Sequence, residues 1–188
     1  MLSSPVWRGT PALAFDAGLA VGGMITATVL VVAGSLLRAP LPEPARWALV
    51  GTALAVVLLK EAGVLSITLP EARRLVPESV FRFGRHLGPL QFGIEMGTGA
   101  RTYLPSGLPY AAGAAVLLLA SVPAALAAGV GFGLGRALMT TASLRYSPDG
   151  GTGSGWNEQW QRNQRRLALL TGSALVVSLL AATVASAR

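Results

Sequence analysis

Long apolar stretches alternate with short polar ones along the whole chain. The first, residues 17–37, has no charged side chain and is long enough for a helix across a bilayer, which takes about 20 apolar residues. A cleaved signal peptide has an apolar core of only about 7–15 residues, so we interpret this stretch as a retained span. The pattern predicts an all-α fold, a single polytopic bundle of about five transmembrane helices over residues 1–188. The predicted spans are 12–37, 46–67, 88–118, 121–140 and 167–187, with cytoplasmic loops at 70–87 and 141–166.

The region 87–139 has no polar loop and is too long for one span. Two arrangements fit: a broken span with a re-entrant piece, or two full spans hinged near residues 121–123. Cytoplasmic loops are enriched in arginine, so the basic loops before and after this region are both expected in the cytoplasm. An even number of crossings between them satisfies this, which favours two full spans. The flanking arginines are Arg73, Arg74, Arg82 and Arg85 before the region, and Arg145, Arg162, Arg165 and Arg166 after it. We therefore expect a cytoplasmic N-terminus and an outer C-terminus.

Composition supports a membrane protein and removes several kinds of chemistry. Hydrophobic residues make up 52% of the chain and charged residues 12%, against about 25% charged in soluble domains. There is no cysteine and one histidine, which excludes disulfides, thiolate metal sites and bis-His haem. We expect no metal and no cofactor. The net charge of +7, almost all from arginine, predicts contact with anionic lipid at the cytoplasmic face of a bacterial inner membrane rather than with nucleic acid.

The middle of the third predicted span combines two features that are costly in a membrane. Glu95 and Arg101 are ionisable, and ionisable residues within a span are candidates for function. Pro105, Gly107 and Pro109 predict a break in this span, and irregular backbone at membrane depth needs protein or a water-filled cavity around it. Glu95 and Arg101 are about 120° apart around a helix, so we expect each to pair with a different helix or to face a polar cavity.

Further polar side chains fall within the predicted spans. For Lys60 and Arg136 we favour the interpretation that the side chain extends to the membrane surface. Thr98 and Thr102 share the helical face of Glu95 and predict a polar track along it. The candidates for an intramembrane polar site are Glu95, Arg101, Thr98, Thr102, Asp16, Glu61 and Arg136.

Glycines four positions apart recur in the spans. Gly93 and Gly97 form such a pair in the third span, and Gly129 and Gly133 form another in the fourth. Small residues at this spacing let two helix backbones approach closely, so we expect helix packing at both pairs. The alternative is that the glycines make room for a ligand or let the helix bend. The same spacing also occurs at Gly18/Gly22 and Gly131/Gly135.

The segment FGIEMGTGARTYLPSGLP, residues 92–109, resembles the glycine-rich, proline-broken spans of the cytochrome c biogenesis CcdA/DsbD family of membrane thiol–disulfide carriers. In that family a Thr-Pro-Cys-x-Gly-Pro turn carries a redox cysteine. The corresponding positions here, 102–107, contain none. The resemblance covers a minor part of the chain and implies a helix-broken membrane fold shared with that family, without thiol electron transfer.

No P-loop, G-x-S-x-G or H-E-x-x-H motif is present, and a single acid such as Glu95 does not make a hydrolase, so we expect no enzyme. The first hypothesis is a non-catalytic scaffold or assembly partner, or a cysteine-less relative of a membrane redox carrier, acting with a membrane protein partner or as a homo-oligomer. The second is a transporter of a small solute or protons that uses Glu95 and Arg101. A membrane enzyme acting on lipid is a third and weaker alternative.

Overall fold

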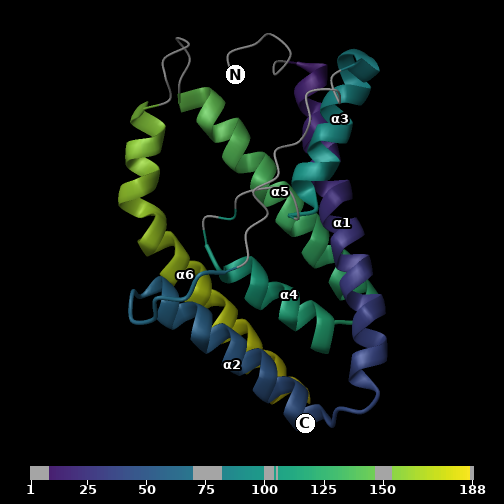
Figure 1. Ribbon diagram of the computed structural model, residues 1–188, viewed down its shortest axis with the longest axis vertical. Coiled ribbons are helices and arrows are strands. Elements are labelled where there is room, and N and C mark those ends of the chain that lie inside the picture. Colours follow the sequence, from purple (N-terminus) through teal and green to yellow (C-terminus); the bar gives the residue numbers. More distant parts are fainter. Residues whose placement is uncertain (1–8, 70–81, 100–103, 105, 147–153, 187–188) are drawn as a thin grey trace.

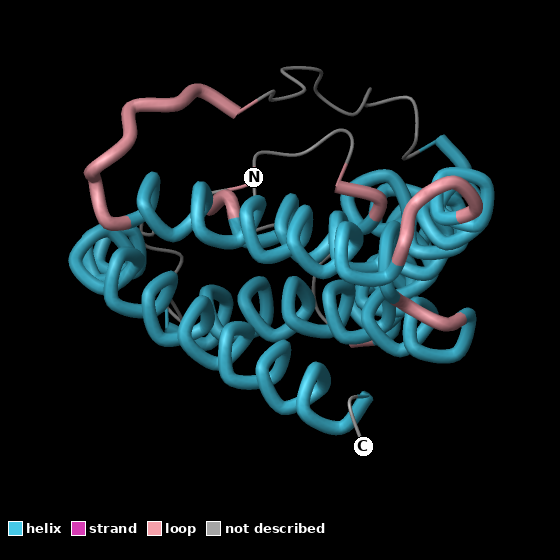
Figure 2. Tube along the Cα trace, turned by 90° about the horizontal axis from the view of Figure 1, so that it is seen from below, coloured by secondary structure: helices cyan, strands magenta, loops and turns pink. Residues whose placement is uncertain are grey.

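The computed structural model of the protein describes residues 9–69, 82–99, 104, 106–146 and 154–186, and this part of the chain is all-α. Figure 2 shows helices and connecting loops, with no strand among the described residues. The described residues form six helices: α1 (Thr10–Arg38), α2 (Glu43–Glu61), α3 (Gly84–Gly97), α4 (Leu108–Leu119), α5 (Val122–Tyr146) and α6 (Ser154–Ser186).

The helix α1 is the one against which most of the structure packs. It contacts α3 and α5 extensively and α4 less so (Figure 1). A second group of contacts joins α2 to α4 and to α6. The short helix α4 therefore connects the tightly packed group of α1, α3 and α5 with the outer pair, α2 and α6.

Two helices are long and apolar enough to cross a membrane. They are α1 and the Val122–Thr140 part of α5, with mean hydropathies of 2.0 and 1.4. The helix α4 is apolar as well, but its 12 residues extend only about 18 Å. Large apolar side chains are exposed on several helices, and extensive exposed apolar surface indicates contact with lipid or with other proteins. Examples are Leu13, Leu36, Leu138, Leu170 and Val177.

The predicted third span consists of two helices with an interruption between them. The helix α3 ends at Gly97 and α4 begins at Leu108, so the break starts earlier than the prolines indicated. Gly99 ends α3: its φ is 72°, a conformation that favours glycine, and its N–H donates to the carbonyl of Met96 at 3.2 Å. Pro109, expected within the break, lies in the first turn of α4, where its fixed φ and missing N–H are tolerated.

The other helix boundaries also differ from the predicted spans. The helix α2 ends at Glu61 rather than near residue 67, because Gly63 adopts a φ of 76° and its N–H donates to the carbonyl of Lys60 at 2.9 Å. Both α5 and α6 extend into the predicted loop 141–166, which is therefore partly helical. The polar first half of α6 is rich in glutamine and arginine, which are good helix formers.

A sharp turn separates α4 from α5 at the position where a hinge was expected. Ala120 adopts an extended conformation, with φ of −73° and ψ of 140°. Ser121 follows, and its carbonyl accepts a 2.9 Å hydrogen bond from the N–H of Ala125 in the first turn of α5. After this turn α5 packs along α1 (Figure 1).

Candidate functional site at the helix break

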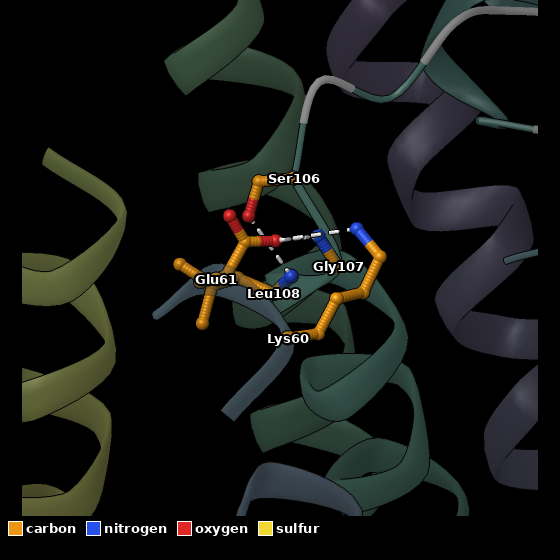
Figure 3. A network of polar contacts seen from close by, with 5 residues as sticks. All are labelled: Lys60, Glu61, Ser106, Gly107 and Leu108. Carbon is orange, nitrogen blue, oxygen red and sulfur yellow. Dashed lines mark hydrogen bonds and ion pairs between the residues drawn. The ribbon is translucent and has the colours of Figure 1, made fainter. Parts of the chain in front are cut away.

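The amino end of α4 is held by side chains outside the helix. The N–H of Gly107 donates a 2.7 Å hydrogen bond to Oε1 of Glu61, the last residue of α2. The N–H of Leu108 donates to Oγ of Ser106 at 3.1 Å, and Nζ of Lys60 lies 3.9 Å from the same Glu61 oxygen (Figure 3). The first N–H groups of a helix lack partners within the helix and carry partial positive charge, so the Glu61 carboxylate stabilises this end of α4.

The carboxyl end of α4 is held by a base from another helix. Nη1 of Arg38, the last residue of α1, donates a 2.7 Å hydrogen bond to the carbonyl of Ala120, just after α4. Nη2 of Arg38 also donates to the carbonyl of Val31 in its own helix at 3.3 Å. A cation at the carboxyl end and a carboxylate at the amino end both complement the dipole of α4. This short helix is therefore clamped by α1 and α2.

The carboxyl end of α3 accepts a hydrogen bond from a hydroxyl group on α1. Oγ1 of Thr26 on α1 donates a 2.8 Å hydrogen bond to the carbonyl of Thr98, the residue that follows α3. Oγ1 of Thr98 in turn donates to the carbonyl of Glu95 at 2.7 Å. Such partners matter at a helix end, because the last carbonyl groups of a helix have no partner within the helix.

A cavity of about 790 Å³ lies beside the break, bordered by α1, α4, α5 and the end of α3. Its size is within the range of ligand pockets, roughly 300–1,000 Å³. Its polar side chains include the hydroxyls of Thr26, Thr98 and Tyr110, while most of its surface is apolar. No acidic or basic residue occurs among its described lining residues, so a charged ligand would have no counter-charge there.

The residues expected to form one polar site are spread over several places. Glu61 lies at the amino end of α4, Thr98 lines the large cavity, and half-buried Glu95 is not among the described lining residues. The predicted track along the Glu95 face assumed a helix that continues past Thr98, but α3 ends one residue earlier, so that assumption is wrong. Arg101, Thr102 and Pro105 lie outside the described residues.

Two further candidates lie on the helices beside α3. Asp16 is partly buried on α1. The guanidinium of Arg136 on α5 lies 5.7 Å from the ring centroid of Phe132, a cation–π contact. Neither Asp16 nor Arg136 is among the described residues that line the large cavity.

The packing of α1 against α3 brings two backbones together at glycines. A Cβ atom placed on Gly18 would lie 2.9 Å from Cα of Gly93, and one placed on Gly22 would lie 2.8 Å from Cα of Gly97. Both distances are shorter than van der Waals contact, so no larger residue fits without moving a helix.

The packing of α1 against α5 uses glycine in the same way, but on one face of α5 only. A Cβ atom on Gly129 would lie 2.8 Å from the carbonyl carbon of Gly23, and one on Gly133 would also meet the α1 backbone. Gly131 and Gly135 are exposed instead, and no described atom lies within 4 Å of a Cβ placed on either. Gly129 and Gly133 therefore pack against α1, whereas Gly131 and Gly135 lie on an exposed face of α5.

Several residues that hold the helix ends had no role assigned from the sequence. The first predicted span ended at residue 37, so Arg38 had no assigned role, although it lies in the last turn of α1, where a base can donate to the last carbonyl groups of a helix. Ser106 was noted only as part of a motif position. Arg165, taken as a loop residue, donates to the carbonyl of Ala62 at the end of α2. Their partners come from distant segments, which spacing along the chain does not reveal.

No group of three or more His, Cys, Asp or Glu side chains that could hold a metal ion occurs in the described part of the chain. No protein family, curated protein or solved structure matches the chain.

Proposed function

We propose that the chain is a five-crossing membrane protein in which α3 and α4 together make one crossing. The support is the direction of the helices: α1 and α6 run from the end of the molecule near the N label toward the end near the C label, and α5 returns (Figure 1). The loop with Ala39 and the first half of α6 then lie on opposite sides of the membrane. Cysteine labelling in cells checks this: Ala39→Cys should react with an impermeant maleimide from outside, and Gln161→Cys should react only after permeabilisation. Labelling of both from one side would contradict the arrangement.

Within that arrangement, the function best supported is that of a non-catalytic assembly protein, which associates with a second copy of itself through α5. One observation carries this proposal: the exposed glycines Gly131 and Gly135 have the spacing that the chain uses for backbone contact with α1. Without a hydrophobic driving force between helices in lipid, such small-residue faces are where membrane helices associate. Leu138, one turn after Gly135, is 71% exposed and would border that contact.

Oxidative cross-linking tests this proposal, because the chain has no native cysteine. Leu138→Cys should give a covalent dimer in membranes, and adding Gly131→Leu should reduce the dimer severalfold by keeping the two helices apart. Leu170→Cys on α6 is the matched control, since Leu170 is also apolar and 67% exposed. Equal cross-linking at both positions, or a purely monomeric protein in mild detergent, would refute the assembly role.

A second candidate function is transport of a small uncharged amphipathic solute. The large cavity at the break favours it, because discontinuous membrane helices in transporters border substrate sites. Gly113 lines this cavity, and a Cβ placed on it would lie 3.6 Å from Cδ1 of Leu30, an ordinary contact, so Gly113→Leu would fill part of the cavity. The resemblance to the thiol–disulfide carriers is compatible with a broken span, but the absence of cysteine removes their chemistry.

Reconstituted liposomes distinguish transport from assembly. Wild-type protein should accelerate movement of a fluorescent short-chain glycolipid, whose sugar headgroup is uncharged, between leaflets, and Gly113→Leu should abolish most of that acceleration. Gly51→Leu is the control, because Gly51 on α2 is exposed with no described atom near its Cβ position. Equal rates in protein-free, wild-type and Gly113→Leu liposomes would exclude this transport activity.

A further inference from the structure

The large cavity beside the break has three helical walls. Its lining residues lie within 23–30 on α1, 109–117 on α4 and 128–132 on α5, next to the end of α3. The helices α4 and α5 each pack on α1, but they contact each other little after the turn that joins them (Figure 1). The cavity therefore lies in the fork between α4 and α5, against α1.

All three walls come from uncharged parts of their helices. Residues 17–37 of α1 have no charged side chain, and Ala27, which lines the cavity, is at the middle of this stretch. The helix α4 contains no charged residue, and the first charge on α5 is Arg136, after the residues that line the cavity. In a chain that crosses a membrane with these helices, the cavity lies at the depth of the hydrocarbon, where lipid tails rather than water surround the protein.

The lining offers few groups that a polar ligand could use. Oγ1 of Thr26 already donates to the carbonyl of Thr98, and Oγ1 of Thr98 donates to the carbonyl of Glu95. The third hydroxyl among the described lining residues belongs to Tyr110, in the first turn of α4. Burying a polar group without a hydrogen-bond partner costs free energy, so this lining favours an apolar ligand. The larger apolar side chains around it are Leu30, Leu104, Val116, Leu117 and Phe132.

We infer that this cavity holds one hydrocarbon chain of a membrane lipid, which enters from the bilayer through the fork between α4 and α5. A dry apolar cavity of about 150 Å³ binds benzene in another protein, so a cavity of about 790 Å³ has room for a longer chain. The chain gives the lining side chains van der Waals partners. This inference depends on the proposed membrane placement but not on transport, because the chain is a resident ligand.

Photochemical labelling in reconstituted liposomes tests this occupant. The probe is phosphatidylcholine with a diazirine in the middle of one acyl chain, and mass spectrometry of the digested protein locates the label. Ala27 and Val116 line the cavity and are only 4% and 8% exposed, so a lipid chain reaches them only from inside the cavity. We expect label on both of these cavity residues, in addition to label on two lipid-facing residues, Val32 and Leu134, which are 59% and 49% exposed.

The variant Gly113→Leu distinguishes a chain in the cavity from lipid around the protein. Its larger side chain occupies part of the cavity, and the added Cβ makes only an ordinary contact with Leu30. Label on the two cavity residues should fall severalfold, whereas label on the two lipid-facing residues should stay the same. Gly51→Leu is the matched control and should change neither, because no described atom lies near the Cβ position of Gly51.

Two results of this labelling would overturn the proposal. The first is label on the lipid-facing residues alone in the wild type, which is also the result expected if a second copy of the chain covers the fork. The second is equal label on the cavity residues in the wild type and in Gly113→Leu.

Water in the cavity is the other alternative, and thiol reactivity tests it. In liposomes, Gly113→Cys should not react with a water-soluble methanethiosulfonate reagent, because apolar surroundings keep a thiol protonated and unreactive. Ser121→Cys is the control and should react, because Ser121 is exposed just after α4. Fast reaction of Gly113→Cys would show water in the cavity and would overturn the proposal.

Extraction with alkaline carbonate tests the membrane placement separately. Release of the wild-type chain from membranes would refute that placement, whereas a retained chain without label on the cavity residues would refute only the lipid site. Label on the cavity residues without accelerated movement of lipid between leaflets would support a resident chain and exclude the transport candidate.

Discussion

Replacing Gly93 with alanine tests the contact between α1 and α3. A Cβ at this position would collide with the carbonyl oxygen of Phe15, and it would lie 3.0 Å from Cα of Gly18 and 3.1 Å from N of Leu19. These atoms all belong to the backbone of α1, so no side-chain rotation relieves the overlap and the two helices must move apart.

The expected loss of stability combines two opposing contributions. Overpacking a close contact costs about 1–3 kcal/mol, while alanine favours a helix over glycine by about 1 kcal/mol. We therefore expect Gly93→Ala to lower the free energy of unfolding by about 1–2 kcal/mol. The matched control is Gly51→Ala on α2, where no described atom lies near the added methyl, so stability should stay the same or rise by up to about 1 kcal/mol.

Unfolding in mixed detergent micelles, followed by far-ultraviolet circular dichroism while the fraction of sodium dodecyl sulfate is raised, measures both variants under the same conditions. The midpoint of Gly93→Ala should fall below that of the wild type, and the midpoint of Gly51→Ala should not. Equal midpoints for the two variants would refute the backbone contact between α1 and α3.

Three further predictions concern the hydrogen bonds that hold the two ends of α4 and the carboxyl end of α3. Glu61→Ala should lower the stability by about 1 kcal/mol, as for other lost amino-terminal caps, while Glu61→Gln should stay close to wild type; equal thermal midpoints would contradict capping by Glu61. Arg38→Ala should speed amide hydrogen exchange in the last turn of α4 more than in α3, since it removes the donor to Ala120. Thr26→Val should cost about 1 kcal/mol because it removes the hydrogen bond from Oγ1 of Thr26 to the carbonyl of Thr98, and an unchanged unfolding midpoint would count against that hydrogen bond.

The sequence pattern is informative about helices because burial or lipid exposure imposes long apolar stretches. Residues 17–37 predict most of α1, and the prolines predict an interruption between α3 and α4. The exact ends of the helices depend on local backbone conformation, because Gly63 and Gly99 end α2 and α3 with a positive φ. The hydropathy pattern does not distinguish these two glycines from the other glycines among the 23 in the chain.

The arrangement at the break is harder to predict because its contacts join distant segments. Glu61 was a candidate as an intramembrane acid, but its role as a cap depends on Gly107, 46 positions away. Arg38 donates to the carbonyl of Ala120, 82 positions away, and its position at the end of an apolar stretch does not indicate this partner. Spacing within one helix cannot identify such partners, since they depend on how the helices pack.

The central claim is that α3 and α4 form one interrupted crossing rather than a re-entrant pair. Arg85, at the start of α3, and Ser121, just after α4, are both exposed and can each be changed to cysteine in a chain that has none. In intact cells, an impermeant maleimide should label Ser121→Cys, while Arg85→Cys should react only after permeabilisation. Labelling of both residues from the same side of the membrane would contradict the claim.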